Sequence, residues 1–233
     1  MKRSFRKYRL ITFLLSIVVV TASAQDTEYN MEVGILGGGC FYMGDANTSQ
    51  IFLNTDKAIG ILARYNLNPR MVLKSDLAYG RLLGSTERAS TTFPDRQTAN
   101  FNRSIYEWST QFEYNFFAYG SEAGYKDSHR LTPYIQAGIG LTFSPKPVDN
   151  VLAMNLPIGI GIKYKIAPRI NIGAEWSFRF TTSDKLDVSD VEGIILSDPY
   201  NITSKGLKNK DSYSFAIAYI SYDIFAKKCD CND

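Results

Sequence analysis

Apolar and polar residues alternate with a period of two along most of the chain, which is typical of half-buried β-strands. In the segment 106–116, Trp108 and Phe112 mark an apolar face, whereas Glu107 and Glu113 mark a polar face. The same alternation recurs in seven further segments, which are 30–43, 57–67, 70–83, 132–143, 158–166, 169–181 and 211–225. The pattern predicts eight strands of about ten residues, the length that a tilted strand needs to cross a bilayer.

The links between these segments differ in length. Asn68-Pro69 and Ala167-Pro168 mark two short turns, and a polar link of intermediate length covers roughly 119–130. The other four links are predicted to be longer, at 44–56, 84–100, 144–154 and 182–210. Outer-membrane barrels have short periplasmic turns at one rim and long external loops at the other. We therefore predict an all-β fold, an eight-stranded antiparallel transmembrane β-barrel whose chain ends, including the C-terminus, lie in the periplasm.

The two faces of the predicted strands differ in chemistry. Aromatic residues, among them Tyr65, Trp176 and Tyr213, gather on one face, as in the aromatic girdles of membrane barrels. Glycines such as Gly138 and Gly161 gather on the other face, where they fit a narrow barrel interior. That face also carries ten charged residues, which are Glu32, Arg64, Lys74, Asp76, Glu107, Glu113, Lys163, Lys165, Glu175 and Arg179. Because a buried charge needs a partner, we predict that they form an ion-pair network filling the lumen.

The last strand fits this assignment poorly. With Tyr213 and Tyr219 on the aromatic face, Ser221 and Asp223 fall on the lipid side. A bulge or an early exit from the bilayer would be required there. A soluble eight-stranded barrel, in which the apolar face points inward, is the alternative architecture.

The N-terminal region has the features of a targeting segment. Five basic residues within the first nine positions precede the apolar stretch 10–20 and the sequence Ala22-Ser23-Ala24. This order predicts a secretory signal peptide that is cleaved after Ala24, with an uncleaved anchor as the alternative. The net charge of +3 originates there, because the remaining residues carry 21 bases and 23 acids, so no nucleic-acid partner is expected. The predicted organisation is a signal peptide over 1–24, a barrel over 25–226 and a periplasmic cysteine-containing tail over 227–233.

Motifs for enzymatic chemistry are missing from the sequence. The lone histidine, His129, falls in a polar link, and Gly37-Gly38-Gly39 interrupts a strand, where it predicts a kink or bulge and not a phosphate loop. Four acids in the longest loop lack the spacing of a calcium site; they are Asp184, Asp187, Asp190 and Glu192. We therefore predict a protein that is not an enzyme, with no catalytic residues, cofactor, metal or small-molecule substrate. Outer-membrane lipids are the expected surroundings.

The three cysteines cannot all pair within one chain. Cys40 is predicted on the order of 30 Å from the rim that Cys229 and Cys231 follow, far beyond the ~6 Å between the α-carbons of a disulfide. A bridge between Cys229 and Cys231 would close a strained ring. Because exported proteins meet an oxidising compartment, we hypothesise that Cys229 or Cys231 forms a disulfide with a periplasmic partner. A strained local bridge, unpaired tail thiols and metal capture are the alternatives.

Four stretches carry a resemblance to a known family: GGGCFYMGD (37–45), RYNLNPR (64–70), TPYIQAGIG (132–140) and SDKLDVSD (183–190). The chain resembles the PorG family, the outer-membrane β-barrel components of the type IX secretion system. One departure is Leu186-Asp187-Val188, where the family often has two adjacent acids. The resemblance implies an accessory role, in association with the periplasmic ring of the PorK lipoprotein and PorN, and it supplies no catalytic residues. The alternative function is that of a passive channel or a surface adhesin, although eight strands leave little space for a channel.

Overall fold

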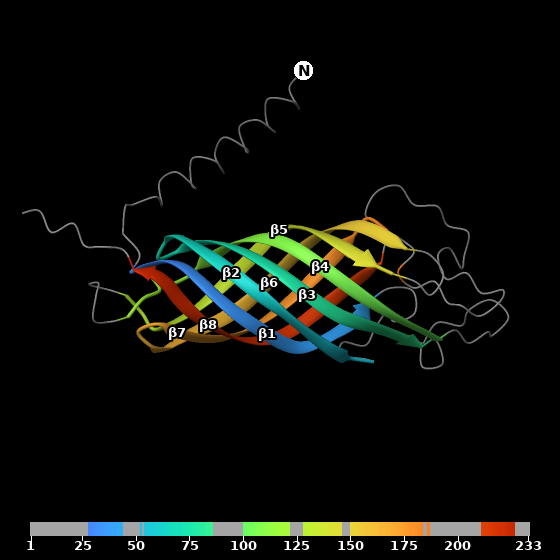
Figure 1. Ribbon diagram of the computed structural model, residues 1–233, viewed down its shortest axis with the longest axis horizontal. Helices are drawn as coiled ribbons and strands as arrows, with labels where there is room; N and C mark the ends of the chain where they lie inside the picture. Colours follow the sequence, from blue (N-terminus) through green and yellow to red (C-terminus); the bar gives the residue numbers. More distant parts are fainter. Residues whose placement is uncertain are drawn as a thin grey trace, which may run out of the picture.

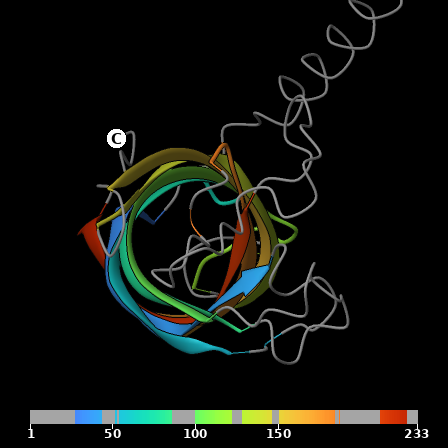
Figure 2. The same cartoon turned by 90° about the vertical axis from the view of Figure 1, so that its right-hand side faces the viewer.

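The protein folds as a closed antiparallel barrel of eight strands. The computed structural model describes residues 28–43, 52, 54–85, 100–121, 128–145, 150–183, 186 and 211–226. The strands are β1 (Tyr29–Met43), β2 (Asp56–Asn68), β3 (Met71–Ser85), β4 (Asn100–Asn115), β5 (Leu131–Ser144), β6 (Val151–Ala167), β7 (Ile170–Thr181) and β8 (Ser212–Ala226). Each strand pairs with its neighbours in sequence, and β1 also pairs with β8, so the sheet closes (Figures 1 and 2). The predicted fold is confirmed.

Several strands are longer than the alternation predicts. β6 has 17 residues and begins at Val151, seven positions before the predicted start. Its inward residues Val151 and Ala153 are apolar, like the outward Leu152 and Met154, so the alternation disappears over this stretch. The link between β5 and β6 is therefore confined to 145–150, and the predicted long link at 144–154 is wrong.

One rim of the barrel, here called the turn rim, carries the short connections. Pro69-Arg70 joins β2 to β3, and Pro168-Arg169 joins β6 to β7. Asn68 favours the first turn because its Oδ1 accepts hydrogen bonds from the backbone N–H groups of Arg70 and Met71, at 2.8 and 2.7 Å. The link between β4 and β5 and the chain ends of β1 and β8 lie at the same rim, as Figure 1 shows.

Of the kink or bulge predicted at Gly37-Gly38-Gly39, the bulge is absent. The register of β1 with both β2 and β8 is continuous through these three residues. In the described strands, register shifts lie beside the two short turns, between Asn66 and Asn68 and between Lys165 and Ala167. The glycines of β1 instead permit close contact, since a Cβ on Gly38 would overlap the backbone of Ala216 and Ile217 in β8.

The outer face of the barrel is apolar on every strand. Large hydrophobic side chains point away from the barrel and are more than a third exposed; examples, one from each strand, are Ile35, Ile59, Leu77, Trp108, Ile139, Ile160, Ile172 and Ile220. A continuous apolar band of this kind is unstable in water and is typical of strands that face hydrocarbon. The soluble-barrel alternative is therefore excluded. Among the described residues, no helix is long and apolar enough to cross a membrane.

The orientation predicted for β8 is wrong. Tyr213, Ile217 and Tyr219 point into the barrel, where each is at most 6% exposed, and Ser221 and Asp223 follow them inward. The required bulge or early exit disappears, because Ser221 and Asp223 share the inward face with Tyr213 and Tyr219. The lumen needs large side chains to fill its volume, and aromatic rings supply that volume on this strand.

Substitution of an inward glycine tests how closely the strands approach one another. A Cβ on Gly138 would overlap the backbone carbonyl of Thr110 in β4, whereas a Cβ on Gly37 would lie 3.9 Å from its nearest neighbour, the carbonyl oxygen of Ala58. We expect Gly138→Ala to destabilise the barrel by roughly 3 kcal/mol, because backbone atoms cannot move aside cheaply. Gly37→Ala is the matched control and should change stability little. Urea unfolding in detergent micelles measures both, and equal losses would contradict the prediction.

Candidate functional site: a sealed polar lumen

Arg64 of β2 lies at the centre of the lumen and joins carboxylates from three other strands. Its Nη1 is 2.7 Å from Oε1 of Glu32 in β1, and its Nε is 2.9 Å from Oε1 of Glu113 in β4. A third carboxylate, Glu175 of β7, lies 3.9 Å from Nη2. The guanidinium also stacks on Tyr219, 4.2 Å from the ring centroid. All of these groups are nearly inaccessible to solvent, so their charges are compensated within the protein.

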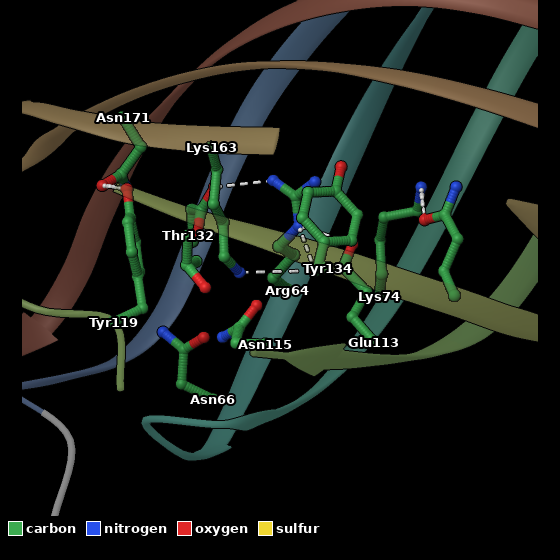
Figure 3. A network of polar contacts seen from close by, with 12 residues as sticks. Arg64, Asn66, Lys74, Glu113, Asn115, Tyr119, Thr132, Tyr134, Lys163 and Asn171 are labelled. Atoms are coloured by element: carbon green, nitrogen blue, oxygen red, sulfur yellow. Dashed lines mark hydrogen bonds and ion pairs between the residues drawn. The ribbon is translucent and has the colours of Figure 1, made fainter. Parts of the chain in front are cut away.

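Two lysines extend this cluster along the lumen (Figure 3). Lys74 Nζ is 2.8 Å from Oε1 of Glu175 and donates a hydrogen bond to Oε1 of Gln136 at 2.9 Å. Lys163 Nζ lies 3.5 Å from Oε2 of Glu113. Tyr134 donates its hydroxyl to Glu175 at 3.0 Å. The cluster therefore joins six strands, β1, β2, β3, β4, β6 and β7, through ion pairs, and β5 through neutral donors and acceptors.

Separate ion pairs lie on either side of the central cluster. Toward the turn rim, Lys165 Nζ is 2.5 Å from Oδ2 of Asp223, and Oδ1 of the same carboxylate accepts a hydrogen bond from Asn171 Nδ2 at 2.8 Å. Toward the opposite rim, Arg179 Nε is 3.0 Å from Oε1 of Glu107. Tyr213 donates a hydrogen bond to the same Glu107 carboxylate. The aromatic residues of β8 thus serve as partners of the lumen charges.

The structure places all ten charged residues named from the sequence inside the barrel, each at most 5% exposed. Nine of them form ion pairs. Asp76 differs: its Oδ1 accepts hydrogen bonds from Ser109 Oγ at 2.8 Å and from Gln111 Nε2 at 2.9 Å. Buried charged residues that were not predicted are Arg103, Asp211 and Asp223. The shared face of Ser221 and Asp223 was the sequence signal for the last of these.

The link between β4 and β5 closes the lumen at the turn rim. Tyr119 points into the barrel beside Asn171 and Lys163, as Figure 3 shows, and its hydroxyl donates to Oδ1 of Asn171 at 2.7 Å. The Nζ atoms of Lys163 and Lys165 lie 4.9 and 5.3 Å from the centroid of the Tyr119 ring. Burial raises the pKa of the Tyr119 hydroxyl well above its usual value, so it stays a protonated donor.

The described residues of the link between β4 and β5, 116–121 and 128–130, are here called the plug. Backbone hydrogen bonds fix the plug against the turn rim. Tyr119 N–H donates to the carbonyl of Pro69 at 3.0 Å, and His129 N–H donates to the carbonyl of Ala118 at 2.7 Å. Ser121 Oγ donates to Oε1 of Glu28 at 2.6 Å. His129 is exposed, so it contributes its backbone to the plug and not a buried imidazole.

At the opposite end, apolar and polar side chains line the lumen, and Leu186 of the link between β7 and β8 lies inside it. Leu186 is fully buried among side chains of the barrel wall, including Leu82, Ile105 and Tyr213. Its backbone N–H donates to Oδ2 of Asp211 at 2.8 Å, and Tyr42 donates its hydroxyl to the other oxygen of that carboxylate. Leu186, the first residue of the stretch that departs from the PorG pattern, therefore lies inside the barrel. The other loop acids named from the sequence, Asp184, Asp187, Asp190 and Glu192, lie outside the described residues.

The arrangement offers structural ion pairing and little reactive chemistry. Across the described residues, no group of three or more His, Cys, Asp or Glu side chains could hold a metal ion. Cys40 is a buried free thiol inside the wall. Cys229 and Cys231 lie outside the described residues, so their disulfide stays a prediction, as does the cleaved signal peptide over 1–24. An acid–base pair would need a free carboxylate, whereas the carboxylates of the buried glutamates accept hydrogen bonds from arginine and lysine side chains.

The apolar outer band and the charged, filled interior define a small outer-membrane β-barrel protein. Residues 8–233 match the family described as "Domain of unknown function (DUF6089)", and the chain belongs to that family. No curated protein matches the sequence.

Solved structures with a similar arrangement of strands are outer-membrane proteins. The N-terminal β-barrel domain of Pseudomonas aeruginosa OprF is 14% identical, with a TM-score of 0.47 over 85% of this chain and 100% of that one. Neisserial surface protein A is 14% identical, with a TM-score of 0.48 over 83% and 97%. The outer membrane protein OprG of P. aeruginosa is 11% identical, with a TM-score of 0.44 over 87% and 99%. At these identities the likeness concerns the fold alone.

The buried position of Arg64 generates a stability prediction. Arg64→Met leaves Glu32 and Glu113 without their strongest partner in a site that water does not reach, so we expect a loss of about 3–5 kcal/mol. Arg81→Met is the control, because Arg81 is 45% exposed and its atoms lie 3.7 Å from Asp56. That exposed pair should contribute under about 1 kcal/mol. Urea unfolding of both variants in micelles decides, and similar losses would refute a central role for Arg64.

The filled lumen generates a second prediction, on ion permeation. Ion pairs occupy the interior, while Tyr119 and Leu186 fill its two ends. We therefore expect no stable conductance from the purified protein in planar bilayers, under conditions in which a porin of known conductance gives clear current steps. Large and lasting steps that scale with the amount of this protein would show an open lumen and overturn the prediction.

Proposed function

We propose that this chain is a non-enzymatic β-barrel component of the type IX protein secretion system, associating with the periplasmic ring formed by the PorK lipoprotein and PorN. The observation that carries the proposal is a lumen filled with compensated charges and plugged at both ends. A barrel of this kind cannot pass a substrate through itself. The protein would then act through its surfaces, as an attachment point for other proteins in the membrane.

The sequence and the turns indicate which rim of the barrel would face the periplasmic ring. The motifs that resemble the PorG family include RYNLNPR (64–70), which ends in the first short turn, and TPYIQAGIG (132–140), which lies in β5. The turn rim would face the periplasm, as short turns do in outer-membrane barrels. The tail at 227–233 follows β8 at that rim, so Cys229 and Cys231 would be available there for a disulfide with the ring.

The alternative function is a small barrel that acts as a passive channel or a surface adhesin. The packed interior argues against the channel. An adhesin would act through the long links between β3 and β4 and between β7 and β8, most of which lie outside the described residues. The sequence of these links shows no recognisable binding pattern, and the secretion role is therefore preferred.

Site-specific cross-linking in intact cells tests the proposal. A photoreactive amino acid at Pro168, in an exposed turn of the turn rim, should capture the PorK lipoprotein or PorN. The same group at Asn102, exposed at the opposite end of β4, is the matched control and should capture neither. Capture of these partners from Asn102 alone would show that the opposite rim, and not the turn rim, faces the periplasm. Capture from neither site, with both variants correctly assembled in the outer membrane, would overturn the association.

A further inference from the structure

Two exposed arginines occupy equivalent positions at the turn rim. Arg70 follows Pro69 in the turn between β2 and β3, and Arg169 follows Pro168 in the turn between β6 and β7. Four strands separate these turns in either direction around the closed barrel, so the two arginines lie on opposite sides of it. They therefore do not form one compact patch.

Each arginine is held beside outward aromatic residues. Arg70 Nη1 donates to the backbone carbonyl of Phe116 at 2.9 Å. Arg169 Nη1 donates to the hydroxyl of Tyr222 at 3.4 Å, and its guanidinium lies 5.4 Å from the centroid of the Tyr29 ring. Phe116 and Tyr222 are nearly half exposed on the lipid-facing side. Aromatic and basic residues in this arrangement are typical of the boundary between hydrocarbon and headgroups.

The charges of Arg70 and Arg169 are not compensated by the described part of the chain, within which neither forms an ion pair. The acids described at this rim have other partners. Glu28 accepts hydrogen bonds from Ser121, and Asp223 pairs with Lys165. Each guanidinium therefore retains donors and a full positive charge at the membrane boundary.

We propose that Arg70 and Arg169 bind the headgroup phosphates of anionic glycerophospholipids in the leaflet at the turn rim. The planar guanidinium matches a phosphate group in shape and charge. Two arginines on opposite sides of the barrel, beside lipid-facing rings, suit a flat layer of headgroups better than a single protein contact. The proposal rests on the proposed orientation only in assigning this leaflet to the periplasmic side.

Competition between lipids around the purified protein tests this. Trp108 and Trp176 lie on the outer face, so phosphatidylcholine with brominated acyl chains quenches their fluorescence when it surrounds the barrel. Adding unbrominated phosphatidylglycerol should restore the fluorescence of the wild-type protein at a lower lipid fraction than that of R70Q/R169Q. We expect the relative affinity to fall about fivefold for each arginine removed. R81Q, at the opposite rim, should behave as wild type, and unbrominated phosphatidylcholine should not distinguish the proteins.

The outcomes separate this inference from the proposed function. Equal recovery curves for wild type and R70Q/R169Q, with both proteins folded by their mobility on unheated gels, overturn the lipid site. If the curves are equal and R70Q/R169Q also loses the cross-link from Pro168 to the ring, the arginines contact a protein instead. A lipid preference that R70Q/R169Q abolishes supports the lipid site, whether or not any ring protein is captured.

Discussion

The structure depends on the burial of one guanidinium with three carboxylates. Arg64 in β2 contacts Glu32 of β1, Glu113 of β4 and Glu175 of β7, which are far from it in sequence. A half-formed sheet would leave these charges facing hydrocarbon or each other, at a cost of several kcal/mol per ion. Only the closed barrel brings all four groups together. The network therefore favours a single closed arrangement of the strands, and the apolar outer face alone would not distinguish it from others.

The strands could be predicted because lipid demands an apolar side chain at every second position, as in 106–116 and 158–166. Their ends could not, since the inward Val151 and Ala153 of β6 are apolar like their outward neighbours, so the contrast between the faces of that strand is lost. The face of β8 is predicted wrongly for a different reason: an aromatic side chain suits either face, and the hydroxyl of Tyr213 contacts Glu107 inside the barrel. Periodicity shows which residues share a face, but not which face is inside.

The residues of the lumen network could be predicted from their charge and from the strand face that they share. Which residues form ion pairs with each other could not. Which base meets which acid depends on the stagger of strands far apart in sequence, as with Lys74 and Glu175. Asp76 shares the inward parity of Lys74, but it accepts hydrogen bonds from Ser109 and Gln111 and forms no ion pair within the described part of the chain. The plug was missed altogether, because Tyr119 lies in a link with no periodic pattern.

The plug also bears on how the barrel acquires its correct stagger. The backbone N–H of Tyr119 donates to the carbonyl of Pro69 beside β3, and its hydroxyl donates to the side chain of Asn171 in β7. Both hydrogen bonds form together only when these distant parts of the wall have their native relative positions. A slip of two residues is the smallest that keeps each face on its own side. Such a slip of β7 would carry Asn171 away by ~7 Å and leave the buried Tyr119 hydroxyl without its acceptor. The hydrogen bonds of the link between β4 and β5 thus form in full only when the strands have their native stagger.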